Sequence, residues 1–223
     1  MNFAWRVPGR LDPAGVVFDL DGVLLDSEAI HAAAFHTVLA SRGIVDFVYA
    51  DHAGIRTDAV FTRVFAARGR ASSQGELAAC VAEKRALARA SLEARTPLAP
   101  GCVEVVRDLS ARRRLFLATS ASAGTVELFF RASGLRDAFV GWLCGDDVPS
   151  AKPDPAIYVR ALAALGCSPR DGAVVEDAIA GVEAARGAGA TVIGLGVGAR
   201  AGALREAGCA VVVPRLADLV TLL

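Results

Sequence analysis

Two aspartates follow a short apolar run near the start of the chain. The run Gly15–Phe18 is directly followed by Asp19 and, two positions later, by Asp21. In an extended chain the side chains of residues i and i+2 project to the same side, so the two carboxylates repel each other unless a cation lies between them or one is protonated. This pattern favours a Mg²⁺ site in which one aspartate is free for nucleophilic attack and the other for proton transfer. The simpler alternative is that both aspartates cap the next helix.

Further polar residues stand near the ends of later apolar runs. Thr119 and Ser120 follow Leu115–Ala118, Lys152 lies in the loop after the run that ends near Cys144, and Glu176 and Asp177 follow Ala173–Val175. A lysine and Mg²⁺ neutralise phosphate charge, while a hydroxyl and neighbouring backbone N–H groups hold phosphoryl oxygens. Together with the aspartate pair, these residues predict a chemically complete site for phosphoryl transfer.

Six apolar runs could position these residues. They are Gly15–Phe18, Arg114–Ala118, Phe139–Cys144, Gly172–Val175, Thr191–Leu195 and Ala210–Val213. Short apolar runs that alternate with helix-length segments are typical of a parallel sheet covered on both faces, so the predicted fold class is α/β. Ligands of such sheets bind outside the carboxyl ends of the strands, which is where the polar residues stand.

A long segment without a clear strand separates the first two runs. It contains three stretches rich in alanine, leucine and charge at helical spacing: Ser27–Arg42, Asp58–Arg68 and Glu76–Ala94. A simple crossover between parallel strands needs far fewer residues. We therefore predict an all-helical inserted domain at residues 26–95 and a core domain made of residues 1–25 and 96–223.

The composition argues against several classes of function. Hydrophobic residues make up 54% and charged residues 22% of the 223 residues, with 24 basic and 24 acidic side chains. The balanced charge and a pI of about 6.8 give no general attraction for nucleic acid or anionic membranes. Mean hydropathy is +0.44, but no uncharged stretch reaches the ~18 apolar residues that span a bilayer.

The cysteines and the N-terminus bear on the compartment. Five widely spaced cysteines without a C-x-x-C pair argue against a disulfide framework and against a zinc site. Met1–Asp12 has no apolar segment typical of a secretory signal, and we interpret it as a short frayed leader. Both observations favour the cytoplasm.

With these residues in order, the chain resembles the haloacid dehalogenase superfamily, in the branch with a helical cap inserted after the first motif. The resemblance covers about Gly15 to Leu223. Four motifs carry it: Asp19-Leu20-Asp21-Gly22-Val23-Leu24-Leu25-Asp26-Ser27-Glu28, Leu117-Ala118-Thr119-Ser120, Ala151-Lys152-Pro153-Asp154-Pro155 and Val175-Glu176-Asp177-Ala178. It implies a Rossmann-like core with strand order 5-4-1-2-3 under a helical cap.

The resemblance also implies a role for each motif residue. Asp19 would be the nucleophile that forms an aspartyl phosphate, and Asp21 the general acid and then the base. Thr119, the backbone of Ser120 and Lys152 would hold the phosphoryl group, so Thr119 and Lys152 count with the two aspartates as catalytic. Mg²⁺ would be bound by Asp19, the Asp21 carbonyl, Glu176 and Asp177. The family usually has Ser or Thr where this chain has Ala178.

Three residues of the inserted segment are candidates for substrate binding. His31 stands where related β-phosphoglucomutases have a substrate-facing histidine. Arg56 lies in Gly54-Ile55-Arg56-Thr57-Asp58, which resembles a cap loop that reaches into the site, and Lys84 resembles a cap lysine. The alternatives are an ordinary helix residue for His31, a loop residue without such a role for Arg56 and a solvated helix face for Lys84.

The resemblance and two departures from the mutases predict a Mg²⁺-dependent phosphomonoester hydrolase acting on a small metabolite, either a sugar phosphate or phosphoglycolate. The mutases typically carry a Lys-Asn pair after the serine, whereas this chain reads Ala121-Ser122-Ala123-Gly124. Its cap loop also has the Gly-x-Arg form of phosphatases. A β-phosphoglucomutase-like isomerase and a non-catalytic ligand-sensing protein are the alternatives. No nucleic acid or membrane partner is expected, and the chain is predicted to be a monomer or a weak homodimer.

Overall fold

A computed structural model describes residues 11–223 of the chain. The first ten residues of the predicted leader Met1–Asp12 lie outside this described part. The last two are held against the core: the Leu11 N–H donates to the Leu222 carbonyl at 2.8 Å, and Asp12 pairs with Arg113 at 2.6 Å.

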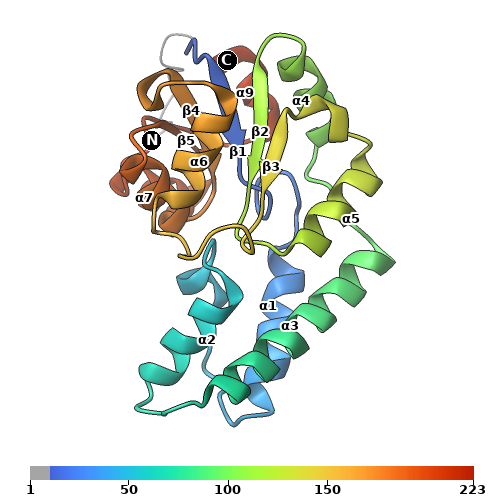
Figure 1. The fold of residues 1–223 in the computed structure, drawn as a ribbon, viewed down its shortest axis with the longest axis vertical. Helices are drawn as coiled ribbons and strands as arrows, with labels where there is room; N and C mark the ends of the chain where they lie inside the picture. Colours follow the sequence, from blue (N-terminus) through green and yellow to red (C-terminus); the bar gives the residue numbers. More distant parts are fainter. Residues whose placement is uncertain (1–10) are drawn as a thin grey trace.

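The described chain forms an α/β fold around one parallel sheet, which confirms the predicted fold class (Figure 1). The strands are β1 (Gly15–Phe18), β2 (Arg114–Ala118), β3 (Gly141–Leu143), β4 (Gly172–Glu176), β5 (Thr191–Leu195) and β6 (Val211–Val213). Their order is β3-β2-β1-β4-β5-β6, which is the implied order 5-4-1-2-3 with β6 added beside β5. The strand predicted at Phe139–Cys144 is shortened to β3, which pairs with β2 alone at the edge of the sheet.

Register brings the predicted site residues to one edge of this sheet. In β1, Phe18 pairs with Leu117 of β2 on one side and with Val175 of β4 on the other. The three strands therefore end within one residue of one another. Asp19 and Thr119, which follow β1 and β2, and Glu176, which ends β4, must meet at the carboxyl ends of these strands.

Helices cover both faces of the sheet. Successive β-strand side chains point to opposite faces, so Val16 and Phe18 pack with one set of helices and Val17 with the other. The first face is covered by α4 (Cys102–Ser110), α5 (Ala123–Ser133) and α9 (Leu219–Leu222), and the second by α6 (Ala156–Leu165), α7 (Ile179–Gly187) and α8 (Gly198–Glu206). Single 3₁₀ turns lie at Arg136–Ala138, Pro169–Asp171 and Leu216–Asp218.

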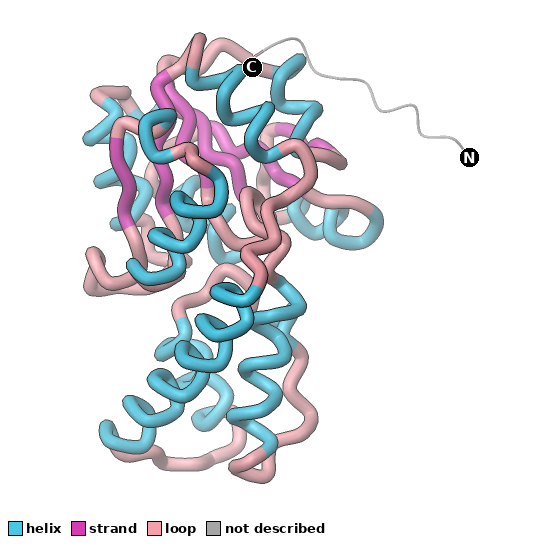
Figure 2. The backbone as a smooth tube through the Cα atoms, turned by 90° about the vertical axis from the view of Figure 1, so that its right-hand side faces the viewer, coloured by secondary structure: helices cyan, strands magenta, loops and turns pink. Residues whose placement is uncertain are grey.

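The segment between β1 and β2 is helical, as predicted, and has its own apolar core. It contains α1 (Glu28–Ala40), a 3₁₀ turn at Tyr49–His52, α2 (Thr57–Ala66) and α3 (Gln74–Ala94). Phe35, Phe61 and Phe65 lie in this separate apolar cluster. Figures 1 and 2 show the three helices projecting from the strand-end side of the sheet, and we call this segment the cap.

Two adjacent chain segments join the cap to the core. The Asp26 N–H donates to the Pro97 carbonyl at 2.8 Å, and Leu25 forms an antiparallel bridge with Leu98. The domain boundaries at 25/26 and 95/96 stay a prediction that this pairing supports. Within the described residues, none of the helices is long and apolar enough to cross a membrane.

Candidate active site

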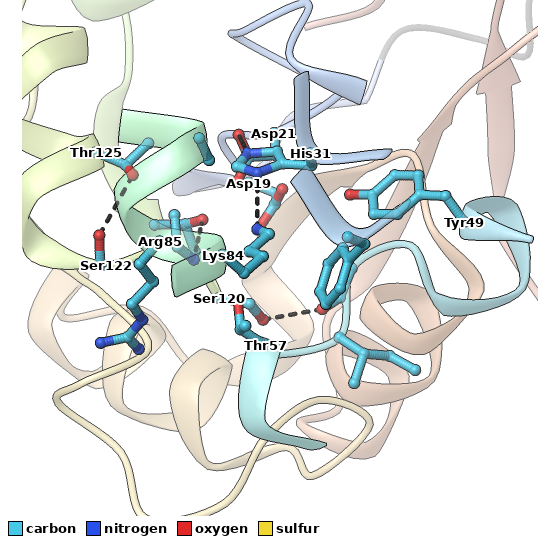
Figure 3. Close-up of a pocket in the computed structure, with 16 residues that line it drawn as sticks. Asp19, Asp21, His31, Tyr49, Thr57, Lys84, Arg85, Ser120, Ser122 and Thr125 are labelled. Carbon is cyan, nitrogen blue, oxygen red and sulfur yellow. Dashed lines mark hydrogen bonds and ion pairs between the residues drawn. The ribbon is translucent and has the colours of Figure 1, made fainter. Parts of the chain in front are cut away.

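The carboxyl ends of β1 and β2 and the facing surface of the cap enclose a cavity of about 50 Å³ (Figure 3). Its lining contains most of the residues predicted from the sequence. These are Asp19, Asp21, Thr119 and Ser120 from the core, and His31 and Lys84 from the cap. The remaining lining is Phe35, Tyr49, Gly54, Ile55, Thr57, Arg85, Ala88, Ala121, Ser122 and Thr125.

Asp19 lies at the base of this cavity, one residue beyond β1. Its N–H donates to the Val175 carbonyl at 3.0 Å, which continues the β1–β4 pairing, and its Oδ1 accepts a hydrogen bond from Lys152 Nζ at 2.6 Å. Burial raises the pKa of Asp19 to about 7 against the opposing charge of Lys152, and the Glu176 carboxylate adds to the rise. The position therefore favours a further cation beside Asp19.

Asp21 is held by the start of the cap. Its Oδ1 accepts hydrogen bonds from Ser27 Oγ at 2.5 Å and from His31 Nε2 at 3.0 Å. Burial acts to raise the pKa of Asp21, but His31 and Ser27 outweigh it and lower the pKa to about 2. Ser27 precedes α1 without capping it, because its hydroxyl is committed to Asp21.

A buried network fixes Lys152 beneath Asp19. Lys152 Nζ donates to Tyr158 Oη and to Glu176 Oε1, each at 2.8 Å, in addition to Asp19. Tyr158 in turn donates to Glu176 Oε1 at 2.5 Å. Burial acts to lower the pKa of Lys152, but the charges of Asp19 and Glu176 outweigh it and raise that pKa, so the amine is a permanent ammonium.

Glu176 is satisfied by protein groups on both oxygens. Its Oε2 accepts the backbone N–H groups of Asp177 at 3.1 Å and Ala178 at 3.2 Å, while Oε1 binds Lys152 and Tyr158. A carboxylate offers about four acceptor positions, so this set fills them. These contacts favour Glu176 as the residue that positions Lys152 and the Asp177 loop, rather than as a direct metal ligand.

Asp19 and Asp177 belong to a cluster of three buried carboxylates in which a metal ion could bind. Asp19, Glu176 and Asp177 each bring an oxygen within 4.8 Å of the others. Burial raises the pKa of Asp177 well above its usual range, and the charges of Glu176 and Asp19 raise it further. Oxygen ligands and unbalanced negative charge suit Mg²⁺, so the donor set fits the predicted ion.

Two glycines permit the close packing around this site. Gly22 has a φ of +81°, and a Cβ there would lie 2.0 Å from Asp177 Oδ2. Gly54 of the cap has a φ of +76°, and a Cβ there would lie 2.7 Å from the Ala178 Cβ. The Ser120 hydroxyl also donates to the Gly54 carbonyl at 2.9 Å, so the cap loop rests directly on the core (Figure 3).

His31 and Lys84 extend the site into the cap. Lys84 Nζ lies 2.9 Å from His31 Nδ1 and 4.5 Å from the centre of the Phe35 ring. The ammonium donates to Nδ1, which places the imidazole proton on Nε2, facing Asp21. Burial lowers the pKa of Lys84 to about 8, against the charge of Asp21. Lys84 is buried, and not on the solvated helix face that the sequence allowed.

Lys84 and Lys152 are the only two lysines in the chain. Both are buried and both take part in this site, one from the cap and one from the core. Every other basic side chain, apart from three histidines, is an arginine.

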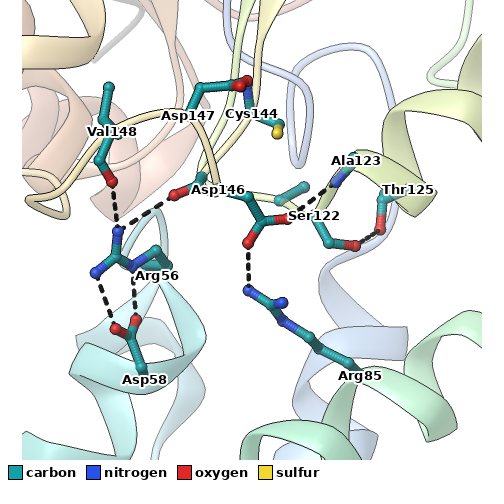
Figure 4. A network of polar contacts seen from close by, with 12 residues as sticks. Arg56, Asp58, Arg85, Ser122, Ala123, Thr125, Cys144, Asp146, Asp147 and Val148 are labelled. Carbon is teal, nitrogen blue, oxygen red and sulfur yellow. Dashed lines mark hydrogen bonds and ion pairs between the residues drawn. The ribbon is translucent and has the colours of Figure 1, made fainter.

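The structure places Arg56 outside the cavity lining. Its guanidinium binds Asp58 at 2.7 and 2.9 Å and donates to the carbonyls of Gly145, Val148 and Pro149 (Figure 4). All of these contacts are to protein groups. Arg56 therefore joins the cap to residues 145–149, and its role in substrate binding stays a prediction.

Arg85 makes a second link between the cap and the same loop. It pairs with Asp146 Oδ1 at 3.1 Å, while the other Asp146 oxygen accepts the Ala123 N–H at 3.4 Å (Figure 4). Arg85 also lines the cavity. Of the two arginines that contact this loop, Arg85 is therefore the one that lines the cavity.

Several site residues were missed by sequence reasoning. Tyr158 and Tyr49 look like core aromatics, because each stands in an apolar or helix-forming stretch. Arg200 of α8 contacts Asp177 Oδ2 at 3.3 Å and Glu28 Oε2 at 2.5 Å. Its charge beyond the carboxyl end of β5 was the one signal that could have indicated it, since this edge of the sheet also holds the residues predicted to be catalytic.

Comparisons with known proteins agree with this geometry. The haloacid dehalogenase-like hydrolase family matches residues 13–189. Fructose-1-phosphate phosphatase YqaB of Escherichia coli (strain K12) is 31% identical over 182 residues, covering 79% of this chain and 93% of that protein. A phosphoglycolate phosphatase of Cereibacter sphaeroides (strain ATCC 17029) is 34% identical over 155 residues, covering 68% of this chain and 71% of that protein. The crystal structure of a hydrolase from Pseudomonas syringae superposes with a TM-score of 0.83 at 26% identity, covering 93% of this chain and 96% of that one.

Proposed function

The chain belongs to the haloacid dehalogenase-like hydrolase family, and we propose that it is a Mg²⁺-dependent phosphatase that acts through an aspartyl phosphate on Asp19. The proposed substrate is a small phosphorylated metabolite, either a sugar phosphate or a phosphoglycolate-like compound. The observation that carries the proposal is the position of Asp19, which lies beside a buried lysine and two further buried carboxylates and lines a small cavity.

The core residues would bind the phosphoryl group and leave Asp19 free to attack phosphorus. Lys152 neutralises negative charge beside Asp19, since its raised pKa keeps it cationic. Thr119 is buried at the end of β2 and lines the cavity with Ser120. The Thr119 hydroxyl and the Ser120 N–H suit equatorial phosphoryl oxygens. When bound at Asp19 and Asp177, Mg²⁺ would supply positive charge that offsets the charge of the phosphate.

Asp21 would carry the proton transfers. His31 and Ser27 hold its carboxylate in one orientation toward the cavity. Its pKa of about 2 makes it ionised in the free site. A phosphate dianion bound nearby would raise that pKa, so that Asp21 could protonate the leaving oxygen and then deprotonate the attacking water.

The cavity supports a small substrate. Its volume of about 50 Å³, which corresponds to a few water molecules, excludes a bulky substrate. Thr57, Ser122 and Thr125 add hydroxyl groups to its wall, which suit a hydroxylated carbon chain. The relatives named for fructose 1-phosphate and phosphoglycolate suggest the two substrate classes.

Transfer to water is favoured over transfer to a second sugar hydroxyl. A mutase must retain a bisphosphate intermediate, but Ala121 and Ser122 bring no charge to the lining. Arg85 is paired with Asp146, and Arg56 binds only protein groups. A second phosphate would therefore find few free cations, and each missing charge-assisted hydrogen bond costs about 1.5–3 kcal/mol.

The experiment that tests this function is a phosphate-release assay over a panel of small phosphomonoesters, with Mg²⁺ and with EDTA. We expect release of inorganic phosphate in step with substrate loss, and none in EDTA. Isomer formation from β-glucose 1-phosphate with little phosphate release would instead establish the mutase. No turnover or isomer with any phosphomonoester would support a ligand-sensing protein.

We also propose that the enzyme works in the cytoplasm as a monomer or a weak homodimer. All five cysteines are free thiols, which supports a reducing compartment. Size-exclusion chromatography with light scattering would measure the oligomeric state directly.

A further inference from the structure

Arg200 lies on the solvent side of the acidic cluster. It extends from α8 and lines an outer cavity of about 480 Å³ together with Asp177, whereas Asp19 does not line that cavity. Asp177 is therefore the carboxylate of the cluster that is reached from this side. The Arg200 side chain is 38% exposed and that of Asp177 is 9% exposed, so the arginine stands between solvent and the carboxylate.

One guanidinium divides its contacts between two acids. Its Nη1 lies 3.3 Å from Asp177 Oδ2, a long contact, and its Nη2 lies 2.5 Å from Glu28 Oε2, a short one. The geometry shows Arg200 drawn mainly to Glu28. Glu28 belongs to the first turn of α1, so the partner that holds Arg200 is part of the cap.

We propose that Arg200 competes with Mg²⁺ for Asp177 and so sets the affinity of the site for the metal, while Glu28 holds Arg200 partly aside. This inference rests on the proposed use of Mg²⁺. A fixed positive charge in contact with a carboxylate opposes the binding of a second cation to the same group. The metal affinity is therefore linked to the cap through Glu28.

The alternative role for Arg200 is to orient Asp177 for the metal. In that case the loss of Arg200 would weaken Mg²⁺ binding instead of strengthening it. The Asp177 carboxylate lies close against the Gly22 backbone, because its three outer atoms all lie within 2.9 Å of the position that a Cβ on Gly22 would take. This close approach limits how far Asp177 can turn when the arginine is absent. The charge of Arg200 is then its main effect on the metal.

The test measures Mg²⁺ binding to the whole protein by isothermal titration calorimetry, without substrate. Replacing a group that orients metal ligands typically lowers metal affinity by about 10- to 100-fold, and we expect a change of comparable size in the opposite direction here. We expect Arg200→Met to lower the Mg²⁺ dissociation constant by about tenfold or more, and Arg200→Lys, which keeps the charge, to stay closer to wild type. Arg205→Met is the matched control, since Arg205 is an exposed arginine of the same helix and its loss changes net charge equally.

Glu28→Gln tests the link to the cap. It should raise the dissociation constant in the wild-type background, because Arg200 then turns fully to Asp177, and it should have little effect in the Arg200→Met background. A direct attraction between Glu28 and Mg²⁺ would give the same effect in both backgrounds, and this result would overturn the role of Glu28.

The outcomes separate this inference from the proposed function. Wild-type protein that binds no Mg²⁺ at millimolar concentration would refute the proposed metal dependence, and the inference with it. Wild-type protein that binds Mg²⁺, with Arg200→Met unchanged or weaker, would overturn the inference alone. Thermal unfolding of each variant shows whether a change in binding follows from loss of the fold. If Arg200→Met does not fold, Mg²⁺ binding by the Arg200→Lys variant is compared with that of wild type instead.

Discussion

Replacing Lys84 with methionine tests the most unusual charge of the site. The substitution keeps an unbranched side chain of similar length but removes the ammonium that lies between His31 and the Phe35 ring. The pKa of Lys84 falls from its ordinary value of 10.5 to about 8 in the folded protein because the amine is buried. At about 1.4 kcal/mol per pKa unit, the charged form costs the native state about 3 kcal/mol relative to the neutral form.

The sign of the pH dependence follows from the order of the two pKa values. Below pH 8 the lysine is charged in both the folded and the unfolded chain, so the native state bears the whole cost. Between pH 8 and 10.5 the folded chain is deprotonated first, and wild-type stability rises relative to the variant. Above 10.5 both states are neutral and the cost is gone.

Urea unfolding of wild type and Lys84→Met at pH 7 and pH 10.5 measures this difference. We expect the free energy of unfolding of wild type, minus that of the variant, to increase by about 3 kcal/mol between the two pH values. The hydrogen bond to His31 is lost in the variant at both pH values, so it cancels. Cysteine ionisation in the unfolded chain also cancels, because it is common to both proteins.

The Lys84→Met substitution should slow catalysis, although it removes the cost of the buried charge. Without Lys84, the Nδ1 atom of His31 loses its donor, and the orientation of His31 against Asp21 is less secure. Turnover should therefore fall at pH 7 even though the buried charge is relieved. A difference in stability that stays constant within about 1 kcal/mol from pH 7 to 10.5 would refute the reasoning, since it would mean that Lys84 is not charged at a cost.

Three further predictions concern the core of the site. Asp19→Asn should reduce phosphate release to background while the protein stays folded, and turnover near the wild-type rate would exclude the aspartyl phosphate. Gly22→Ala should weaken Mg²⁺ binding in calorimetry, because its Cβ would lie 2.0 Å from Asp177 Oδ2; Gly43→Ala is the control, with a similar φ of +76° and no neighbour within 4 Å, so equal binding by both variants would contradict this account. Tyr158→Phe should lower the free energy of unfolding by about 1–3 kcal/mol, since it leaves Lys152 and Glu176 short of a buried partner, and an unchanged denaturation midpoint would show that this hydroxyl is dispensable.

The centre of the site could be predicted from the sequence because it depends on strand ends. In a parallel sheet the chain direction alone places the residues after each strand at one edge. The apolar runs before Asp19, Thr119 and Asp177 were therefore enough to predict that these residues lie together. His31 and Lys84 also lie in the cavity, which the sequence alone could not establish, because their approach depends on how the cap packs.

The links between cap and core were beyond prediction for a physical reason. Arg56 binds mainly backbone carbonyls, and every residue carries a carbonyl, so no side-chain pattern marks its partners. Arg200 lies 23 positions from Asp177 and reaches it only through the packing of α8 beside β5. Tyr158 lies on the buried, apolar face of α6, where an aromatic residue is typical of a core. The sequence therefore gives no sign that its hydroxyl group contacts the site.

Because the chain has lysine at only two positions, isotope labelling of lysine would mark the active site selectively. Protein grown with ¹⁵N-lysine would give two side-chain NMR signals, one from the core and one from the cap. The Lys152 signal would report on the group beside Asp19, and the Lys84 signal on the cap. Both lysines are buried, so amine-directed fluorophores should leave both halves of the candidate active site chemically untouched.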